Sequence, residues 1–97
     1  NTAVRHNIPS VSIVLNNNCM GAEKSQQKAL HNEKYVGVDL ENPRFDQLAD
    51  VFGAKGYYVN HPSEISDVLD EAVKNSVPSV IEIPVQEYFP PSAPTPR

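Results

Sequence analysis

The sequence predicts an α/β fold in which a parallel β-sheet carries helices on its faces. Three segments, 9–17, 55–60 and 78–85, have the composition of strands: the first and the last are apolar and rich in β-branched residues, and the second contains Tyr57, Tyr58 and Val59. Two segments between them, 41–56 and 61–76, repeat apolar residues with the period of a helix. Strands that alternate with helices are typical of a parallel sheet. Because three strands make a small sheet for such a fold, we expect a partial three-layer αβα domain.

The first strand is expected to follow the end of a helix. Ala3 and Val4 are typical of a last helical turn, and Pro9 stops a helix because the residue before a proline avoids helical backbone angles. Residues 9–17 are apolar nearly throughout, which is typical of a buried, central strand of a parallel sheet. A chain that starts on the end of a helix is expected to be a piece of a longer protein.

A mixed polar segment connects this strand to the next predicted helix. We expect Gly21 to open a short helix that runs to about Leu30, and residues 31–40 to form a loop. A connection of this length is more often functional or mobile than a plain linker.

The two later helices have start and stop signals. In the first, Asn42 is expected to cap the N-terminus, Pro43 to take the first helical position and Gly53 to follow the last. The second has Pro62 near its start. Their predicted apolar faces are Phe45, Leu48, Ala49 and Phe52, and Ile65, Val68, Leu69, Ala72 and Val73. We expect one domain over residues 1–86 and a Pro-rich, extended tail over residues 87–97.

The bulk composition limits the classes of function. The chain has 97 residues, enough for one small domain, and a hydrophobic content of 39% suggests that part of its core comes from elsewhere. A net charge of −4 without a basic stripe argues against nucleic acid as a partner. No segment is apolar and long enough to cross a membrane. The single Cys19 cannot form an internal disulfide, which fits a cytoplasmic location.

The stretch SIVLNNNCMG, residues 12–21, is the main candidate for a functional site. Ligands of open parallel sheets bind beyond the carboxyl ends of the strands, where these asparagines lie. An Asn side-chain oxygen suits Mg²⁺ or Ca²⁺, and a backbone carbonyl two residues later can point at the same ion. Gly21 and a following helix start can face a phosphate, so the pattern suits a magnesium-diphosphate group. A turn without any ligand explains the same residues, and both interpretations stay open.

At residues 2–21, TAVRHNIPSVSIVLNNNCMG resembles the second half of the cofactor motif of thiamine-diphosphate-dependent enzymes. Later segments, NPRFDQLADVFGAKGYYV, EISDVLDEAV and PSVIEIPV, resemble the end of the same cofactor-binding domain. The resemblance covers residues 1–86 and implies the C-terminal portion of a thiamine-diphosphate-binding fold. Within the family, GAEKSQQ followed by EKYVGVDLENP is most similar to the sulfoacetaldehyde acetyltransferase group, and the acetolactate synthase group is next.

The resemblance implies two metal ligands, Asn17 and Cys19. Asn17 matches the asparagine whose side-chain oxygen binds Mg²⁺, and Cys19 matches the residue whose backbone carbonyl binds the same ion. Asn16, which the resemblance also places among the cofactor-binding residues, matches an asparagine that supports the end of the strand. The thiol of Cys19 is not required for this role.

Three further cofactor-binding residues are implied, and some parts of the site are absent. Gly21 and Ala22 match positions at which the chain turns beside the diphosphate, and Met20 matches one that borders the active-site cavity. The chain contains no Gly-Asp-Gly, which carries another metal ligand of the family, and the activating glutamate belongs to a partner subunit. The resemblance therefore implies a missing N-terminal part of the same enzyme and a homo-oligomeric partner, and this chain alone is not expected to be catalytic.

The resemblance also implies the chemistry of the parent enzyme, which would use thiamine diphosphate and Mg²⁺ on a small-molecule substrate. The nearest group converts sulfoacetaldehyde and phosphate into acetyl phosphate and sulfite. The acetolactate synthase group carries out decarboxylation and carboligation instead. The residues themselves leave open a third reading, a free-standing and non-catalytic α/β interaction module.

Four other residues are weaker candidates. Lys24 is a possible anion contact for the diphosphate or a sulfonate, and the alternative is a solvated lysine in the first turns of a helix. His6, His31 and His61 show no metal-ligand spacing and are expected at the surface or as caps.

Overall fold

The computed structural model describes residues 1–87, and its chain forms two compact units. The first unit comprises residues 1–16 and 42–85, and the second comprises residues 17–41 with residues 86 and 87. The predicted Pro-rich tail lies outside the described residues, apart from Glu87. Among the described residues, no helix is long and apolar enough to span a membrane.

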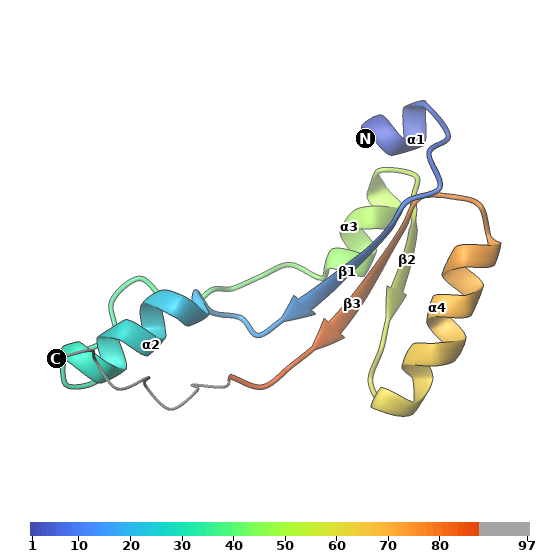
Figure 1. Ribbon diagram of the computed structural model, residues 1–97. Helices are drawn as coiled ribbons and strands as arrows, with labels where there is room; N and C mark the ends of the chain where they lie inside the picture. The colour runs from blue at the N-terminus through green and yellow to red at the C-terminus, as the bar shows by residue number, and fades with distance from the viewer. Residues whose placement is uncertain (88–97) are drawn as a thin grey trace, which may run out of the picture. The chain divides into compact units, whose positions relative to one another are not determined.

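The first unit contains a parallel three-stranded sheet with the order β1-β3-β2 (Figure 1). Its strands are β1 (Val11–Asn16), β2 (Lys55–Tyr58) and β3 (Ser79–Pro84). Both outer strands start in register with the central one, because Val11 and Lys55 each pair with Ser79. The α/β class and the parallel sheet predicted from the sequence are confirmed.

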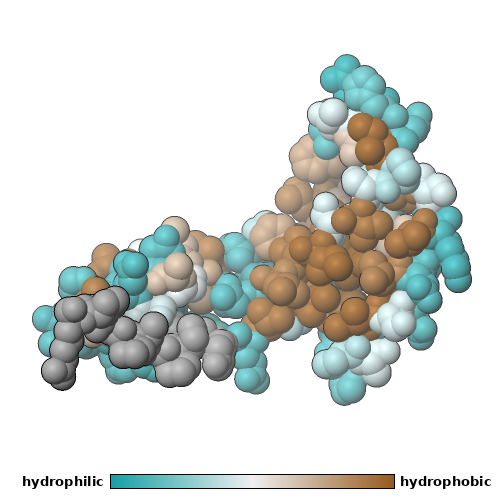
Figure 2. All heavy atoms as spheres, in the orientation of Figure 1, coloured by the Kyte–Doolittle hydropathy of each residue, from teal (hydrophilic) through white to brown (hydrophobic). Residues whose placement is uncertain are grey.

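The position predicted for β1 is wrong. β3 takes the centre, and β1 forms one edge of the sheet within the described residues. On β1, Ile13 is 50% exposed and Leu15 is 65% exposed. Figure 2 shows apolar side chains gathered over the sheet of this unit. The strand therefore has the composition of a central strand in an edge position.

Two helices cover opposite faces of the sheet (Figure 1). They are α3 (Phe45–Val51) and α4 (Ile65–Lys74), and the short helix η1 (Pro62–Glu64) leads into α4. On β3, Ile81 packs with Ala72 of α4 in the core, while the adjacent Glu82 faces the first turn of α3. Successive residues of a strand point to opposite faces, so the two helices lie on different sides.

The helix at the start of the chain is confirmed, but some predicted helix details are wrong. Helix α1 (Thr2–Arg5) precedes β1 as expected. Helix α3 begins only at Phe45, with Arg44 as N-cap, so neither Asn42 nor Pro43 has its predicted role. Asn42 donates instead to the side chain of Asn16. Val73 was expected on the apolar face of α4 and is 63% exposed, because α4 buries a narrower stripe centred on Ala72.

The predicted roles of Pro62 and Gly53 are confirmed, and a third residue, Gly56, explains how closely α3 lies on the sheet. Pro62 opens η1, and Gly53 after α3 has a φ of +80°, a left-handed angle that glycine adopts without strain. At Gly56 in β2, an added Cβ would lie 2.0 Å from the carbonyl oxygen of Asp46. Only glycine permits this close approach of helix and strand.

The second unit is built around helix α2 (Gly21–Leu30), whose predicted bounds are confirmed. The segment after it contains no further helix or named strand up to residue 41, as expected for a loop. An isolated antiparallel bridge joins Cys19 to Asp39. Two hydrogen bonds form this bridge, from Met20 N to Val38 O and from Leu40 N to Asn18 O, both 2.8 Å long.

Candidate cofactor and metal site

The three asparagines after β1 have three different local roles. Asn16 ends the strand and is buried. Asn17 accepts a hydrogen bond from the backbone N–H of Cys19 on its Oδ1 atom, at 3.2 Å, which is the geometry of an Asx turn. Asn18 has a φ of +53°, a left-handed angle that asparagine adopts more readily than most residues. The turn interpretation thus accounts for the backbone, and it leaves one lone pair of the Asn17 oxygen for a ligand.

The backbone of Cys19 points to the same side as the Asn17 oxygen. In the antiparallel bridge, the hydrogen bonds are made by the neighbours of Cys19 and Asp39, so these two residues form a non-hydrogen-bonded pair. The N–H and C=O of such a residue both point away from the partner segment. The Cys19 N–H meets the Asn17 Oδ1 there. The same strand geometry predicts that the Cys19 carbonyl faces that side as well. Two oxygens suited to a hard cation therefore share one side of the turn.

Helix α2 starts directly after this turn and leaves its first N–H groups free of helical acceptors. The first bond within the helix runs from Lys24 N to Met20 O, so the N–H groups of Gly21, Ala22 and Glu23 have no acceptor in the helix. The side chain of the N-cap residue, Met20, makes no capping hydrogen bond. Such a helix start attracts an anion because of its unsatisfied donors and its dipole.

Gly21 and Met20 have distinct surroundings at this helix start. An added Cβ on Gly21 would lie 3.3 Å from Nδ2 of Asn17, so the small residue leaves room for the Asn17 amide. Met20, the N-cap, is exposed, as is Ala22. The five predicted site residues from Asn17 to Ala22 therefore lie together at one turn and one helix start of the second unit.

Asn16 belongs to the first unit, and its side chain is engaged inside that unit. Its Nδ2 donates to Oε1 of Glu82 at 3.0 Å, and its Oδ1 accepts from Nδ2 of Asn42 at 2.9 Å. Glu82 is 2% exposed, and its Oε2 accepts from the backbone N–H groups of Phe45, at 2.7 Å, and Asp46, at 3.3 Å. This network, here called the Glu82 network, fixes the end of β1 and the start of α3. Through this network the Asn16 side chain supports the end of β1, and its place among the cofactor-binding residues stays a prediction.

The sequence analysis missed Glu82 and Asn42 as members of this network. The signal for Glu82 is one charged residue inside an otherwise apolar strand, because a buried charge must be paired or hydrogen-bonded. No comparable signal exists for Asn42, since its position before a helix favours a cap equally well.

An ion pair beside the Glu82 network stabilises the same helix start. Arg44 donates to both carboxylate oxygens of Asp46, each at 2.8 Å, and lies 3.6 Å from the centre of the Tyr58 ring. The Arg44 hydrogen bonds, joined by a backbone donor, hold the pKa of Asp46 below its usual value. The same pair raises the pKa of Arg44, so both groups stay charged.

Lys24 is neither a solvated lysine nor a side chain directed at an open anion site. It is 8% exposed, and its Nζ lies 2.5 Å from Oδ1 of Asp39 and 2.7 Å from Oε1 of Glu87. Its Nζ also lies 5.4 Å from the centre of the Tyr35 ring. Hydrogen bonds to the two carboxylates raise the pKa of Lys24. The expectation of a solvated lysine is therefore wrong, and the ammonium has two carboxylate partners.

Within the part of the chain that the structure describes, the histidines and acidic residues form no group that could hold a metal ion. His6 and His31 lie at the ends of α1 and α2, and all three histidines are exposed. His61 accepts from the backbone N–H of Ser63 and caps η1, as predicted.

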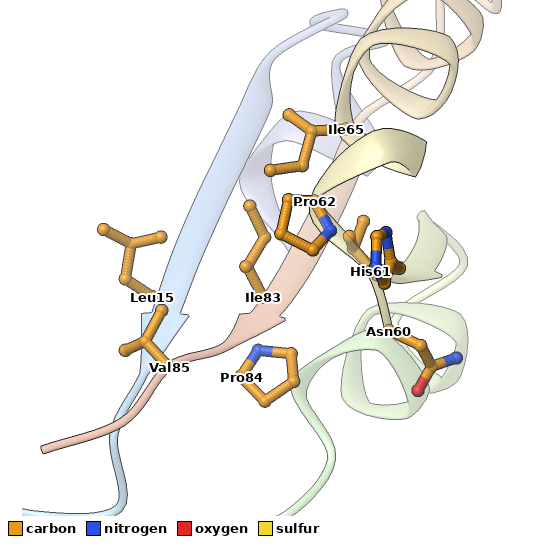
Figure 3. Close-up of a pocket in the computed structure, with 9 residues that line it drawn as sticks. Leu15, Asn60, His61, Pro62, Ile65, Ile83, Pro84 and Val85 are labelled. Atoms are coloured by element: carbon orange, nitrogen blue, oxygen red, sulfur yellow. The ribbon is translucent and has the colours of Figure 1, made fainter.

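A separate cavity of about 290 Å³ lies in the first unit (Figure 3). Leu15, Ile83 and Val85 line it from the strand ends, and Pro62 and Ile65 line it from the other side. Its walls are mainly apolar, so it offers packing surface and few groups for chemistry.

A comparison with protein families identifies the family of this chain. The family described as thiamine pyrophosphate enzyme, C-terminal TPP binding domain, matches residues 1–83. This chain belongs to that family. Thiamine pyrophosphate is another name for thiamine diphosphate, so the match agrees with the resemblance seen at the asparagine motif.

Curated relatives of two kinds are similar to this member of the family. A sulfoacetaldehyde acetyltransferase from Alcaligenes xylosoxydans xylosoxydans is 37% identical over 86 residues, which cover 84% of this chain and 14% of that protein. A probable acetolactate synthase from Mycobacterium bovis is 32% identical over 82 residues, covering 84% of this chain and 15% of that protein. The chain thus spans about a seventh of the length of these relatives.

Two solved structures of decarboxylases share the fold. A thiamine diphosphate-dependent 4-hydroxybenzoylformate decarboxylase from Rhodococcus jostii RHA1 matches with a TM-score of 0.83 and 27% identity, over 92% of this chain and 17% of that one. A benzoylformate decarboxylase from Polynucleobacter necessarius matches with a TM-score of 0.84 and 23% identity, over 94% of this chain and 17% of that one. The second likeness is evidence of fold alone.

Proposed function

We propose that residues 17–22 supply one half of a magnesium–thiamine diphosphate site. Asn17 gives its side-chain Oδ1 to the cation, and Cys19 gives its backbone carbonyl. The N–H groups at the start of α2 face the diphosphate. The observation that carries this proposal is the Cys19–Asp39 bridge together with the Asn17 hydrogen bond, from which strand geometry puts the two oxygens on one side.

The chemistry of the donors fits this group. Both proposed ligands are neutral oxygens, which suit Mg²⁺, and Mg²⁺ in proteins commonly takes further oxygens from a bound phosphate group. Neutral ligands also leave the positive charge of the cation available to the diphosphate. Gly21 leaves room for the Asn17 amide, Met20 borders the cofactor from its exposed position, and Ala22 adds little bulk at the helix start. When bound, the cofactor supplies a carbon nucleophile and an electron sink, and this chain binds and orients it.

We further propose that the parent enzyme resembles sulfoacetaldehyde acetyltransferase, which would convert sulfoacetaldehyde and phosphate into acetyl phosphate and sulfite. The 37% identity to such an enzyme supports this assignment. An acetolactate synthase-like carboligase is the second candidate, supported by the 32% identity of another relative. In both cases the remaining ligands and the activating glutamate come from other parts of a homo-oligomer that acts on a small molecule.

Two assays on the full-length protein that carries this chain separate these candidates. Sulfite release from sulfoacetaldehyde that depends on phosphate supports the acetyltransferase, and acetolactate formed from pyruvate supports the carboligase. A protein that binds thiamine diphosphate but performs neither reaction contradicts both assignments of substrate.

A binding measurement tests the ligand role of Asn17. In the full-length protein, Asn17→Ala should weaken the joint binding of Mg²⁺ and thiamine diphosphate by at least tenfold in isothermal titration, because a cation ligand is lost. Asn17→Asp keeps an oxygen at this place and should retain binding. The control Asn60→Ala changes an exposed asparagine of the first unit. Equal affinity of Asn17→Ala and wild type would remove the basis of the proposal.

A further inference from the structure

Lys24 is an exception to the usual behaviour of lysine, and its burial has a definite cause. Lysine is almost never buried unless it is paired, and this ammonium contacts Asp39 and Glu87 while the Tyr35 ring lies nearby. The carboxylates come from separate segments, 15 and 63 residues away along the chain. One side chain on the first turn of α2 therefore holds two distant segments of the second unit.

The segment held by Asp39 is the one that pairs with the proposed ligand turn. Asp39 is opposite Cys19 in the antiparallel bridge, and two backbone hydrogen bonds flank this pair. A ladder this short is only marginally stable by itself. Lys24 is thus linked to the Cys19 backbone through one ion pair and one pair of hydrogen bonds.

A second contact of α2 holds the same segment farther along. The Gln27 amide donates to Val36 O at 3.1 Å and accepts from Val36 N at 2.8 Å. Lys24 and Gln27 are three residues apart, so they lie on one face of the helix. The segment from Val36 to Asp39 therefore contacts this face of α2 at both of its ends.

We propose that Lys24 is a positioning residue, whose ion pairs with Asp39 and Glu87 hold the segment 38–40 against the turn 18–20 and thereby fix the direction of the Cys19 carbonyl. The link to cation binding rests on the proposed function, whereas the link to the backbone pairing does not. Direct contact of Lys24 with a diphosphate would require its ammonium to give up two carboxylates at 2.5 and 2.7 Å. Its effect on the site therefore passes through Asp39 and the bridge.

Amide hydrogen exchange of the full chain tests the backbone part. In Lys24→Met, exchange at the Met20 and Leu40 amides, which form the bridge, should become at least tenfold faster. The Val59 amide, which donates to Glu82 O in the first unit, should exchange as in wild type. Lys24→Arg should retain most of the protection, because it keeps the charge.

A matched control removes the same charge from the same helix. Lys28→Met should leave the Met20 and Leu40 amides as protected as in wild type. If both methionine variants accelerate exchange equally, a general effect on α2 is responsible and the proposal is overturned. If Lys24→Met destabilises the whole chain, Asp39→Asn provides the same test from the more exposed partner. Unchanged exchange in Asp39→Asn also overturns the proposal.

Titration of the full-length protein with Mg²⁺ and thiamine diphosphate tests the link to the site. We expect Lys24→Met to bind the pair at least fivefold more weakly and Lys24→Arg to recover most of the affinity. A wild type that binds no cofactor contradicts the proposed function, while the exchange data still decide the role of Lys24 in the bridge. A wild type that binds, with Lys24→Met binding equally well, refutes the positioning role. A Lys24→Arg variant as weak as Lys24→Met refutes the requirement for charge.

Discussion

Replacement of Glu82 should destabilise the chain, because this buried carboxylate accepts three hydrogen bonds. Two of them are short, from Phe45 N at 2.7 Å and from Asn16 Nδ2 at 3.0 Å, and the third, from Asp46 N, is 3.3 Å long. In Glu82→Leu, the donors remain without acceptors at a buried site. An orphaned buried donor costs about 1–3 kcal/mol, so the two short bonds together predict a loss of about 4 kcal/mol.

Glu82→Gln should have a smaller effect, because the network can reorient around it. Asn16 Oδ1 accepts from Asn42 Nδ2, so flips of these two amides can present an oxygen to a new amide at position 82. The side-chain oxygen of the introduced glutamine still faces the backbone donors of α3. The loss in the free energy of unfolding is then the difference in strength between hydrogen bonds to a charged and to a neutral acceptor, about 1–2 kcal/mol over two bonds.

Urea unfolding followed by circular dichroism measures both effects. With a slope of about 1 kcal/mol per molar urea, as small domains show, Glu82→Gln should lower the midpoint by about 1–2 M. Glu71→Gln is the control, because Glu71 accepts one 3.3 Å hydrogen bond at an exposed site. Replacing a buried charge with an apolar group can stabilise a protein when no donor is orphaned. A Glu82→Leu variant as stable as wild type, or more stable than Glu82→Gln, would refute the reasoning.

Three further predictions concern single positions. Gly21→Ala should weaken the binding of Mg²⁺ and thiamine diphosphate severalfold in isothermal titration, because its Cβ would crowd the Asn17 amide at 3.3 Å. The free energy of unfolding in urea should change by less than about 0.5 kcal/mol. Gly56→Ala should cost about 1–3 kcal/mol in the same unfolding assay, because its Cβ would overlap the Asp46 carbonyl, and wild-type stability would contradict this packing. Arg44 lowers the pKa of Asp46 from its usual 3.8, so the pair stabilises the fold above pH 3.8 and this stability disappears as the pH falls through the lower, folded-state pKa. The stability gap between wild type and Asp46→Asn should therefore narrow from pH 7 to pH 3, and a constant gap would count against the ion pair.

Local patterns in the sequence were sufficient for the elements and for the class of fold. The bounds of α2 and the proline at the start of η1 depend on neighbouring residues, and both were predicted correctly. The position of β1 was not, because strand order depends on pairing between residues far apart in the chain. The apolar composition of β1 predicts burial on both faces, but it does not say which strand will lie beside it.

The same limit applies to the candidate site. The Asn17 turn and the start of α2 lie within six residues, so their proximity could be read from the sequence. The partners of Lys24 and Glu82 could not, because the contacts of Lys24 reach 63 residues along the chain and those of Glu82 reach 66. In the sequence, a buried charge can be suspected only from a charged residue in an apolar segment. The partners that compensate the charge can be identified only from the folded structure.

The outer margin of β1 has a practical consequence for anyone who isolates this polypeptide. This edge has backbone donors and acceptors beside the exposed side chains of Ile13 and Leu15. It has none of the lysines, prolines or bulges that prevent another strand from pairing with an edge. Purified samples should therefore grow larger assemblies as their concentration rises. A lysine introduced at position 13 is the simplest way to keep them monodisperse.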